Sequence, residues 1–360
     1  MVVFLRYFAY GSPIFLKSNV LEMKELFGTF NIESSFVNSY IISAHATEIK
    51  NRNGTIPVFL NKILKINYTR KISEEAYLQD IKNTLLSMAI PNKRIRIECV
   101  DINSRRGYSS KDIEVFLGES LEKLGVKINL KMPEILLYVI LFDMRCHVGM
   151  ISYKKVQFID SGRHYKSLSS GISRAEFKIM EAFDAFNINF KKGSVALDLG
   201  AAPGGWSTFM AKKGLGVIAI DKGELNSKRI LELGMVYSIM SDNTTNSKIP
   251  SKIIELMPYE ILHIKKRFQD VSELISKYRK ISLITCDMNV SPEESGNAIL
   301  LFKDKLISKG VVIFTIKCKT KYAKKYIADA VSTLSPFFDI KKIIALSSNR
   351  QELTLLARKK

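Results

Sequence analysis

A glycine-rich loop between two aspartates is the first place in the sequence where residue types and spacing indicate chemistry. The stretch VALDLGAAPGGWSTF (195–209) is an apolar run that ends at Asp198 and continues into the loop GAAPGG. A second apolar run, GVIAID, ends on Asp221. Such a loop lets the backbone approach a ligand, and the following helix points its N–H groups at that ligand. A tight strand-to-helix turn would use the same glycines, so the functional interpretation depends on the aspartates.

The charges around the loop indicate a ligand with a ribose and a positive charge but no phosphate. The sequence lacks the GK[ST] of phosphate-binding P-loops and the GxGxxG of dinucleotide sites. Asp198 would repel phosphate but could hold a cationic amino-acid group, and Asp221 is placed to accept hydrogen bonds from a ribose diol. These features fit S-adenosylmethionine, which we expect to be the cofactor. The expected binding residues are Asp198, Gly200, Ala201, Ala202, Pro203, Gly204, Gly205, Trp206, Asp221 and Asp287.

The motif DLGAAPGGWS resembles the cofactor motif of the FtsJ-type RNA 2′-O-ribose methyltransferases, and the resemblance extends through most of 172–360. It implies a catalytic Lys-Asp-Lys-Glu tetrad. The segment SRAEFK gives Lys178, and ISLITCDMNVSPEESG gives Asp287. The strand VVIFTIK ends on Lys317, and NRQELTLLARK supplies Glu352. A single lysine on a helix is usually a solvated charge, so it is the ordered set of four beside the loop that carries the assignment.

The tetrad suits transfer of a methyl group to a ribose hydroxyl, which is a poor nucleophile at neutral pH. A lysine near a second lysine and partly desolvated has a lowered pKa and can accept a proton. We expect Lys317 to play that part, Lys178 to help lower its pKa, and Asp287 and Glu352 to orient the two ammonium groups. The chemistry requires no metal. One departure from the family is Arg267 before Phe268, where an acid usually contacts adenine, so backbone groups or Asp270 are expected to replace it.

The elements that must position these residues form an α/β pattern. From residue 172 onward, strands and helices alternate, which predicts a mostly parallel, Rossmann-like sheet covered on both faces, with its ligands at the carboxyl ends of the strands. Residues 1–70 form an expected ferredoxin-like α+β unit, 71–156 a second α+β unit, and 157–171 a Ser- and Gly-rich linker.

The second unit resembles a THUMP domain, an RNA-binding module, through RIRIECVDINSRRGYSS and GVKINLKMPE. The resemblance implies phosphate contacts from its arginines, although a solvated basic hairpin explains any one of them equally well. The expected contacts are Arg94, Arg96, Arg105 and Arg106.

The overall charge favours a polyanionic partner. The 360 residues carry 55 Lys+Arg against 35 Asp+Glu, a formal charge of +20, which fits RNA. The order of the three units resembles the bacterial large-subunit ribosomal RNA cytidine 2′-O-methyltransferases, so ribosomal RNA is the expected substrate. Transfer RNA remains open as a substrate, as does a non-catalytic RNA-binding protein with the same fold. The sequence does not indicate an oligomeric state.

No feature of the sequence indicates a membrane or a metal site. The longest apolar run, ILLYVILF (135–142), is too short to span a bilayer. The four cysteines show no CxxC spacing, so we expect reduced thiols and a cytoplasmic protein.

Overall fold

The computed structural model of the chain contains two compact units. The first comprises residues 1–55 and 59–158, and the second comprises 56–58 and 159–360. The structure describes residues 4–45, 59–102, 107–130, 132–153, 170–240, 256–276, 280–318, 323–346, 348–349 and 351–360. Most of the expected linker, 157–171, lies outside these ranges.

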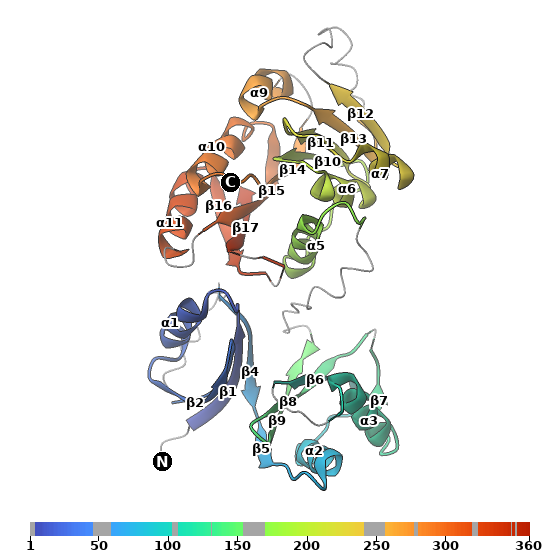
Figure 1. Ribbon diagram of the computed structural model, residues 1–360, viewed down its shortest axis with the longest axis vertical. Helices are drawn as coiled ribbons and strands as arrows, with labels where there is room; N and C mark the ends of the chain where they lie inside the picture. Colours follow the sequence, from blue (N-terminus) through green and yellow to red (C-terminus); the bar gives the residue numbers. More distant parts are fainter. Residues whose placement is uncertain are drawn as a thin grey trace. The chain divides into compact units, whose positions relative to one another are not determined.

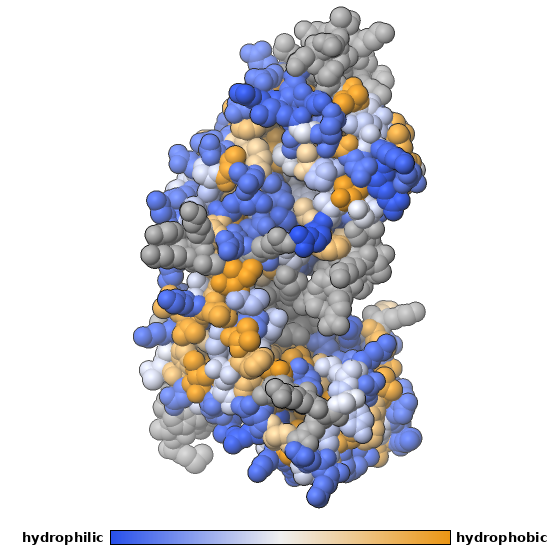
Figure 2. All heavy atoms as spheres, in the orientation of Figure 1, coloured by the Kyte–Doolittle hydropathy of each residue, from blue (hydrophilic) through white to orange (hydrophobic). Residues whose placement is uncertain are grey.

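The first sheet of the N-terminal unit is antiparallel, with strand order β2-β3-β1-β4 (Figure 1). Its elements are β1 (Phe4–Gly11), α1 (Leu16–Phe27), β2 (Phe30–Phe36), β3 (Ser39–His45) and β4 (Leu60–Ile66). Helix α1 buries Met23 and Phe27 against Ala9 of the sheet. Three other apolar residues of this helix, Leu16, Val20 and Leu21, stay exposed, and Figure 2 shows apolar side chains gathered in this region.

The second sheet of this unit has the order β5-β9-β8-β6-β7. Its elements are β5 (Tyr68–Lys71), α2 (Tyr77–Leu86), β6 (Arg94–Asp101), α3 (Ser110–Glu122), β7 (Lys127–Ile128), β8 (Ile135–Phe142) and β9 (Arg145–Ser152). A capping box between Ser109 and Asp112 begins α3, which is the local reason that the helix starts there. Helices α2 and α3 cover one face of the sheet through Ile81, Leu85, Ile113, Leu117 and Leu121.

The two N-terminal sheets share a core, which explains the unbroken apolar run ILLYVILF. Strand β8 directs Leu137 and Val139 toward the helices and Leu136, Tyr138 and Ile140 toward the first sheet, where Phe8 and Ile66 meet them. A strand buried on both faces needs no polar alternation. The boundary expected at residue 70 therefore falls inside one compact unit, and β5 belongs to the second sheet.

The C-terminal unit contains an eight-stranded sheet in the order β12-β13-β11-β10-β14-β15-β17-β16. Its strands are β10 (Val195–Leu199), β11 (Gly216–Ile220), β12 (Val236–Met240), β13 (Glu260–Ile264), β14 (Ile281–Cys286), β15 (Leu306–Lys317), β16 (Phe338–Ile344) and β17 (Glu352–Lys359). Its helices are α5 (Ala175–Ala185), α6 (Gly205–Lys212), α7 (Ser227–Glu232), α9 (Phe268–Ser276), α10 (Pro292–Leu301) and α11 (Ala323–Leu334). Helices α5, α6 and α7 pack on one face, and Figure 1 shows α10 and α11 on the other side.

This arrangement is the expected Rossmann-like α/β fold, and it brings the chemistry-bearing strand ends together. Strands β10, β11, β13, β14 and β15 are parallel, and the chain moves outward in opposite directions from β10 and β14. Ligands bind at such a switch point, outside the carboxyl ends of the strands. Strand β17 runs antiparallel to β15, so its first residue, Glu352, lies opposite Lys317, the last residue of β15. In the part of the chain that the structure describes, no helix combines the length and hydropathy needed to cross a membrane.

Candidate active site

The glycine-rich loop after β10 is held against the neighbouring strand ends. Gly200 and Gly204 have φ of 77° and 106°, a region that glycine adopts without strain. A Cβ at Gly200 would lie 2.6 Å from Met288 Cγ, and one at Gly205 would lie 2.5 Å from Ser173 Oγ. The loop therefore packs against the segment that follows Asp287 and against the turn that precedes α5. Glycine at these positions allows the close approach.

Asp221 lies at the end of β11, with its carboxylate fixed by backbone donors. Ala202 N–H donates to its Oδ2 at 3.0 Å, and Gly223 N–H donates to Oδ1 at 2.7 Å. Each carboxylate oxygen keeps a further lone pair, which can accept a hydroxyl hydrogen bond. A fixed carboxylate with free acceptor positions, beside a loop whose backbone approaches closely, fits a ribose diol and so fits the ribose of S-adenosylmethionine.

A histidine that the sequence interpretation did not include holds the backbone of Asp221. His263 Nε2–H donates to Asp221 O at 3.1 Å, which leaves Nδ1 to accept from the Tyr237 hydroxyl at 3.0 Å. Burial lowers the pKa of His263, which favours this neutral form. The available sequence signal is a lone histidine inside the apolar strand ILHIK.

Asp198 lies inside the sheet and not at the ligand edge. Its side chain is 1% exposed and accepts hydrogen bonds from Ser207 Oγ at 2.6 Å and Thr285 Oγ1 at 2.8 Å. Burial raises the pKa of this carboxyl to about 6. The expected contact with a cationic group of the ligand does not agree with this placement, because both hydroxyl partners belong to the protein. Asp198 instead ties β10 to α6 and β14.

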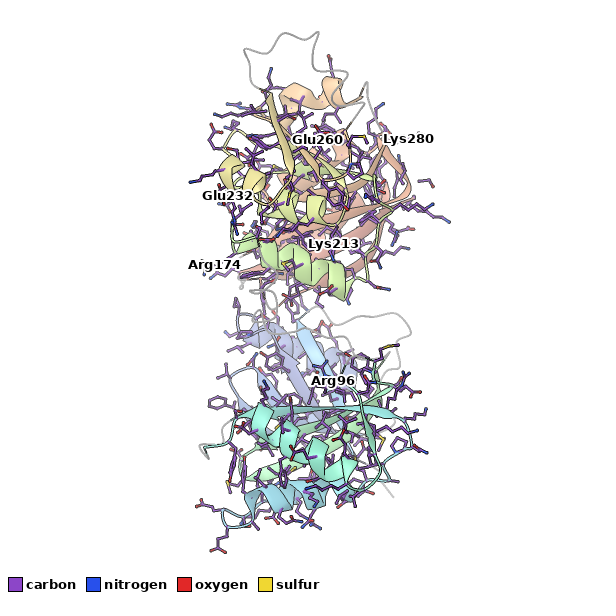
Figure 3. All side chains as sticks on the ribbon, turned by 90° about the vertical axis from the view of Figure 1, so that its right-hand side faces the viewer. Arg96, Arg174, Lys213, Glu232, Glu260 and Lys280 are labelled. Atoms are coloured by element: carbon purple, nitrogen blue, oxygen red, sulfur yellow. The ribbon has the colours of Figure 1, made fainter. Side chains whose placement is uncertain are left out.

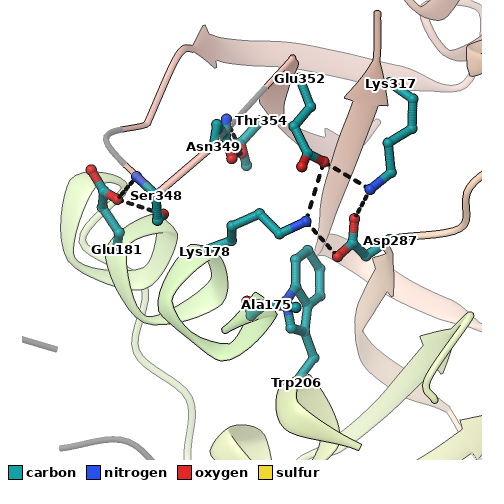
Figure 4. Close-up of polar contacts among 10 residues, drawn as sticks. All are labelled: Ala175, Lys178, Glu181, Trp206, Asp287, Lys317, Ser348, Asn349, Glu352 and Thr354. Carbon is teal, nitrogen blue, oxygen red and sulfur yellow. Dashed lines mark hydrogen bonds and ion pairs between the residues drawn. The ribbon is translucent and has the colours of Figure 1, made fainter. Parts of the chain in front are cut away.

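The four residues of the expected tetrad meet at the carboxyl ends of β14 and β15 (Figure 4). Lys178 Nζ lies 2.7 Å from Asp287 Oδ2 and 3.2 Å from Glu352 Oε2. Lys317 Nζ lies 2.6 Å from Asp287 Oδ1 and 2.7 Å from the same Glu352 oxygen. The two cations and two anions therefore form a closed, alternating ring.

The pKa of Lys317 is shifted upward, whereas the sequence led us to expect a downward shift. Burial lowers the pKa, as expected, but the charges and hydrogen bonds of Asp287 and Glu352 raise it, and the net pKa is above the ordinary value. The prediction of a lowered pKa is wrong for this state, because it weighed the second lysine and not the two carboxylates. Lys317 is an ammonium group at neutral pH in the protein without ligands.

The loop and the tetrad helix are joined by Trp206. Its indole Nε1–H donates to Ala175 O at 2.7 Å, and the ring is 4% exposed (Figure 4). Ala175 begins α5, the helix that carries Lys178. The residue that follows the last loop glycine is thus bonded to the first turn of the helix that supplies a tetrad lysine.

The other residues expected to contact ligands are four arginines of the N-terminal unit and two residues at the start of α9. Arg94 pairs with Glu134 at 3.2 Å, and Arg96, labelled on β6 in Figure 3, lies 3.9 Å from Glu98. Arg105 and Arg106 lie outside the described residues. Arg267 is exposed at the turn before α9, and Asp270 is exposed in the first turn of that helix. Within the described ranges, no group of three or more His, Cys, Asp or Glu is arranged to hold a metal ion.

Comparison with known proteins matches most of the C-terminal unit to a family. Residues 172–346 match the FtsJ-like methyltransferase family. An uncharacterized protein of Methanocaldococcus jannaschii is 32% identical over 192 residues, covering 52% of this chain and 47% of that protein.

Two relatives with ribosomal RNA methyltransferase names also match. Ribosomal RNA large subunit methyltransferase M of Marinomonas sp. is 29% identical over 209 residues, covering 55% of this chain and 59% of the relative. Ribosomal RNA large subunit methyltransferase E of M. jannaschii is 35% identical over 140 residues, covering 35% and 55%. The chain spans about half the length of these three relatives. Residues 172–346 are an FtsJ-like methyltransferase domain, and its cofactor is S-adenosylmethionine.

Proposed function

We propose that the chain is an RNA 2′-O-ribose methyltransferase that acts on large-subunit ribosomal RNA and uses the tetrad Lys178, Asp287, Lys317 and Glu352. The observation that carries the proposal is the ring of two lysines and two carboxylates, closed by four contacts of 2.6–3.2 Å. It lies at the strand ends beside the cofactor loop. A methyltransferase that acts on a hydroxyl needs groups that take or share a proton, and the ring provides them.

The position of each tetrad residue in the site indicates its role in methyl transfer. S-adenosylmethionine supplies an electrophilic methyl group on a positively charged sulfur. Lys317 ends β15, has 24% of its side chain exposed, and is the ring member placed to meet a hydroxyl from solvent. Lys317 first releases its extra proton to solvent, because the positive charge of a bound cofactor would lower its pKa. The neutral amine then accepts the 2′-hydroxyl proton as the methyl group is transferred to that oxygen. Lys178, 8% exposed, stabilises the developing alkoxide charge, while Asp287 and Glu352 fix both Nζ atoms.

Two features support RNA as the substrate. The formal charge of +20 provides cations for phosphate contacts. The relatives named above carry ribosomal RNA methyltransferase names. We assign RNA binding to the N-terminal unit, with residues 71–156 as its THUMP-like part and Arg94 and Arg96 among its phosphate contacts.

Methyl transfer from labelled cofactor tests the function. Ribosomal and transfer RNA pools that lack their own modifications are incubated with the protein and digested to nucleosides. We expect label in large-subunit ribosomal RNA, in a 2′-O-methylated nucleoside whose 3′ phosphodiester resists alkaline hydrolysis when the RNA is treated before digestion. Label in transfer RNA alone would show that transfer RNA, and not ribosomal RNA, is the substrate. A base-methylated product would overturn the tetrad assignment.

Binding measurements distinguish the remaining alternative, a non-catalytic RNA-binding protein. RNA affinity should fall steeply with salt whichever activity is present, because phosphate contacts release counterions. Tight, salt-dependent RNA binding without transfer to any RNA pool would support the non-catalytic protein. Transfer by the wild type but not by Lys317→Ala would exclude it.

A further inference from the structure

A buried carboxylate one turn beyond Lys178 connects two parts of the tetrad. Glu181 is on α5 and is 1% exposed. Its Oε2 accepts hydrogen bonds from Ser348 N–H at 2.9 Å and from Ser348 Oγ at 2.6 Å (Figure 4). Residues three apart on a helix lie on one face, so Glu181 and Lys178 point from α5 toward the same neighbouring segment.

The segment that Glu181 holds leads directly into Glu352. Ser348 precedes Glu352 by four residues, and Asn349 bonds Thr354 of β17, with Nδ2 at 3.1 Å from Thr354 Oγ1. Thr354 and Glu352 are two residues apart in a strand and share one face. The bonds of Glu181 and Asn349 therefore fix both ends of the short stretch that carries the Glu352 carboxylate.

This connection affects the ring because, of its four contacts, the one between Lys178 and Glu352, at 3.2 Å, joins α5 to β17. That distance is the longest of the four, and it spans 174 residues of sequence. No backbone ladder joins a helix to a strand, so side-chain contacts must set their separation. The bond between Glu181 and Ser348 is one such contact, and it joins α5 to the segment four residues before β17.

We infer that Glu181 is a positioning residue of this active site: through Ser348 it sets the distance between Lys178 and Glu352. The inference rests on the proposed function, in which both groups act on the same ribose. A displacement of about 1 Å in a catalytic group can lower the rate on the order of 100-fold.

The helix itself offers a matched control. Glu176, also on α5, is 0% exposed and accepts hydrogen bonds from Ser170 N–H at 2.8 Å and Ser170 Oγ at 2.6 Å. Both carboxylates are buried and accept from the backbone N–H and the hydroxyl of one serine, although Ser170 N–H also lies 2.9 Å from the second oxygen of Glu176. Glu176 lies beside the cofactor loop, 3.4 Å from where a Cβ at Gly205 would be, whereas Glu181 holds the Glu352 segment.

The test compares Glu181→Met and Glu176→Met, which remove the acceptors while keeping the side-chain length. For Glu181→Met we expect kcat to fall about 10- to 100-fold, with the Kd for S-adenosylmethionine within about twofold of wild type. Glu181→Gln should recover most of kcat, because its amide oxygen can accept both Ser348 bonds. Glu176→Met should lower Tm by a similar amount and act mainly on the cofactor Kd. If Glu181→Met is too unstable to assay, Ser348→Ala removes the 2.6 Å bond alone and should lower kcat about threefold.

A second measurement does not require activity. Nitrogen NMR of the lysine ammonium groups, recorded without cofactor, reports the chemical environment of each Nζ atom in the ring. The Lys178 signal should shift in Glu181→Met and stay in place in Glu176→Met. An unmoved Lys178 signal, a wild-type kcat, or equal losses of kcat in the two Met variants would overturn the positioning role. If Lys317→Ala transfers methyl groups as well as wild type, the proposed function fails, and the NMR result still decides whether Glu181 positions Lys178.

Discussion

Lys317→Arg is the substitution that separates a proton acceptor from a fixed positive charge. The Asp287 and Glu352 oxygens lie 2.6 and 2.7 Å from Lys317 Nζ, and a guanidinium can bond both of them. Because a guanidinium stays protonated, it cannot take a proton from the ribose. If Lys317 accepts the proton, Arg and Ala variants should both lose at least ~10²-fold in turnover, with cofactor affinity unchanged.

The raised pKa of Lys317 sets the expected pH dependence. An isolated lysine with a pKa of about 10.4 is neutral in only ~0.4% of molecules at pH 8. The neutral fraction of Lys317 in the free protein is smaller, because Asp287 and Glu352 raise its pKa. Since kcat/KM reports the free enzyme, it should rise about tenfold per pH unit between pH 7 and 9 in the wild type. The residual kcat/KM of Lys317→Ala should not show this rise.

Stability does not contribute to that slope. A lysine whose pKa is raised by folding contributes its full stabilisation below the unfolded pKa of about 10.4, and loses it only as pH rises through the folded pKa. The protein should therefore be equally stable at pH 7 and 9 as far as Lys317 is concerned, which thermal unfolding at both values checks.

The assay is the initial rate of label transfer to unmodified RNA, with S-adenosylmethionine and RNA both far below their KM so that the rate reports the free enzyme. Intact RNA is verified on a gel at each pH. A kcat/KM that stays flat from pH 7 to 9, or an Arg variant with near wild-type turnover, would refute the reasoning. Lys317 would then act as a fixed charge that stabilises the alkoxide.

Three further predictions follow from single contacts. Asp221→Ala should weaken S-adenosylmethionine binding by ~1.5–3 kcal/mol, as for loss of a charged hydrogen-bond partner, and unchanged calorimetric affinity would remove Asp221 from the site. Trp206→Phe loses the 2.7 Å bond to Ala175 and should lower the free energy of unfolding by about 1 kcal/mol; an unchanged urea midpoint would show that the bond contributes nothing. Burial lowers the pKa of His147 to about 4, so stability should fall as pH drops from about 6.5 toward 4, because the unfolded chain binds the proton first. Between pH 7 and 5 this should amount to about 2 kcal/mol, and His147→Gln, whose side chain does not titrate, should reduce that difference in urea unfolding.

Local sequence patterns predicted those parts of the protein that depend on neighbours along the chain. The loop GAAPGG needs glycine wherever φ is positive or the backbone touches another segment, so its residue types reveal a close approach. Alternating apolar strands and amphipathic helices from residue 172 predicted the covered sheet, because each element must bury one face. A lysine at the end of the apolar run VVIFTIK had to lie at the edge of that sheet.

Tertiary structure decided what depends on distance between remote residues. The antiparallel pairing of β17 with β15 puts Glu352 opposite Lys317, and only that pairing gives the lysine two carboxylates and a raised pKa. From the sequence, Asp198 is expected to face the ligand because it lies near a strand end. In the structure, the hydroxyls of Ser207 and Thr285 bind its carboxylate. The direction of such a side chain depends on the helix and strand packed beside it. The sequence does not distinguish Glu181 from any other charged residue on a helix. Only the tertiary structure shows its hydrogen bond with Ser348, 167 residues later. The sequence by itself determined which ionisable and hydrogen-bonding side chains the protein carries. Long-range packing set the distances between them. Because electrostatic and hydrogen-bond energies depend on those distances, packing also set the direction of the Lys317 pKa shift.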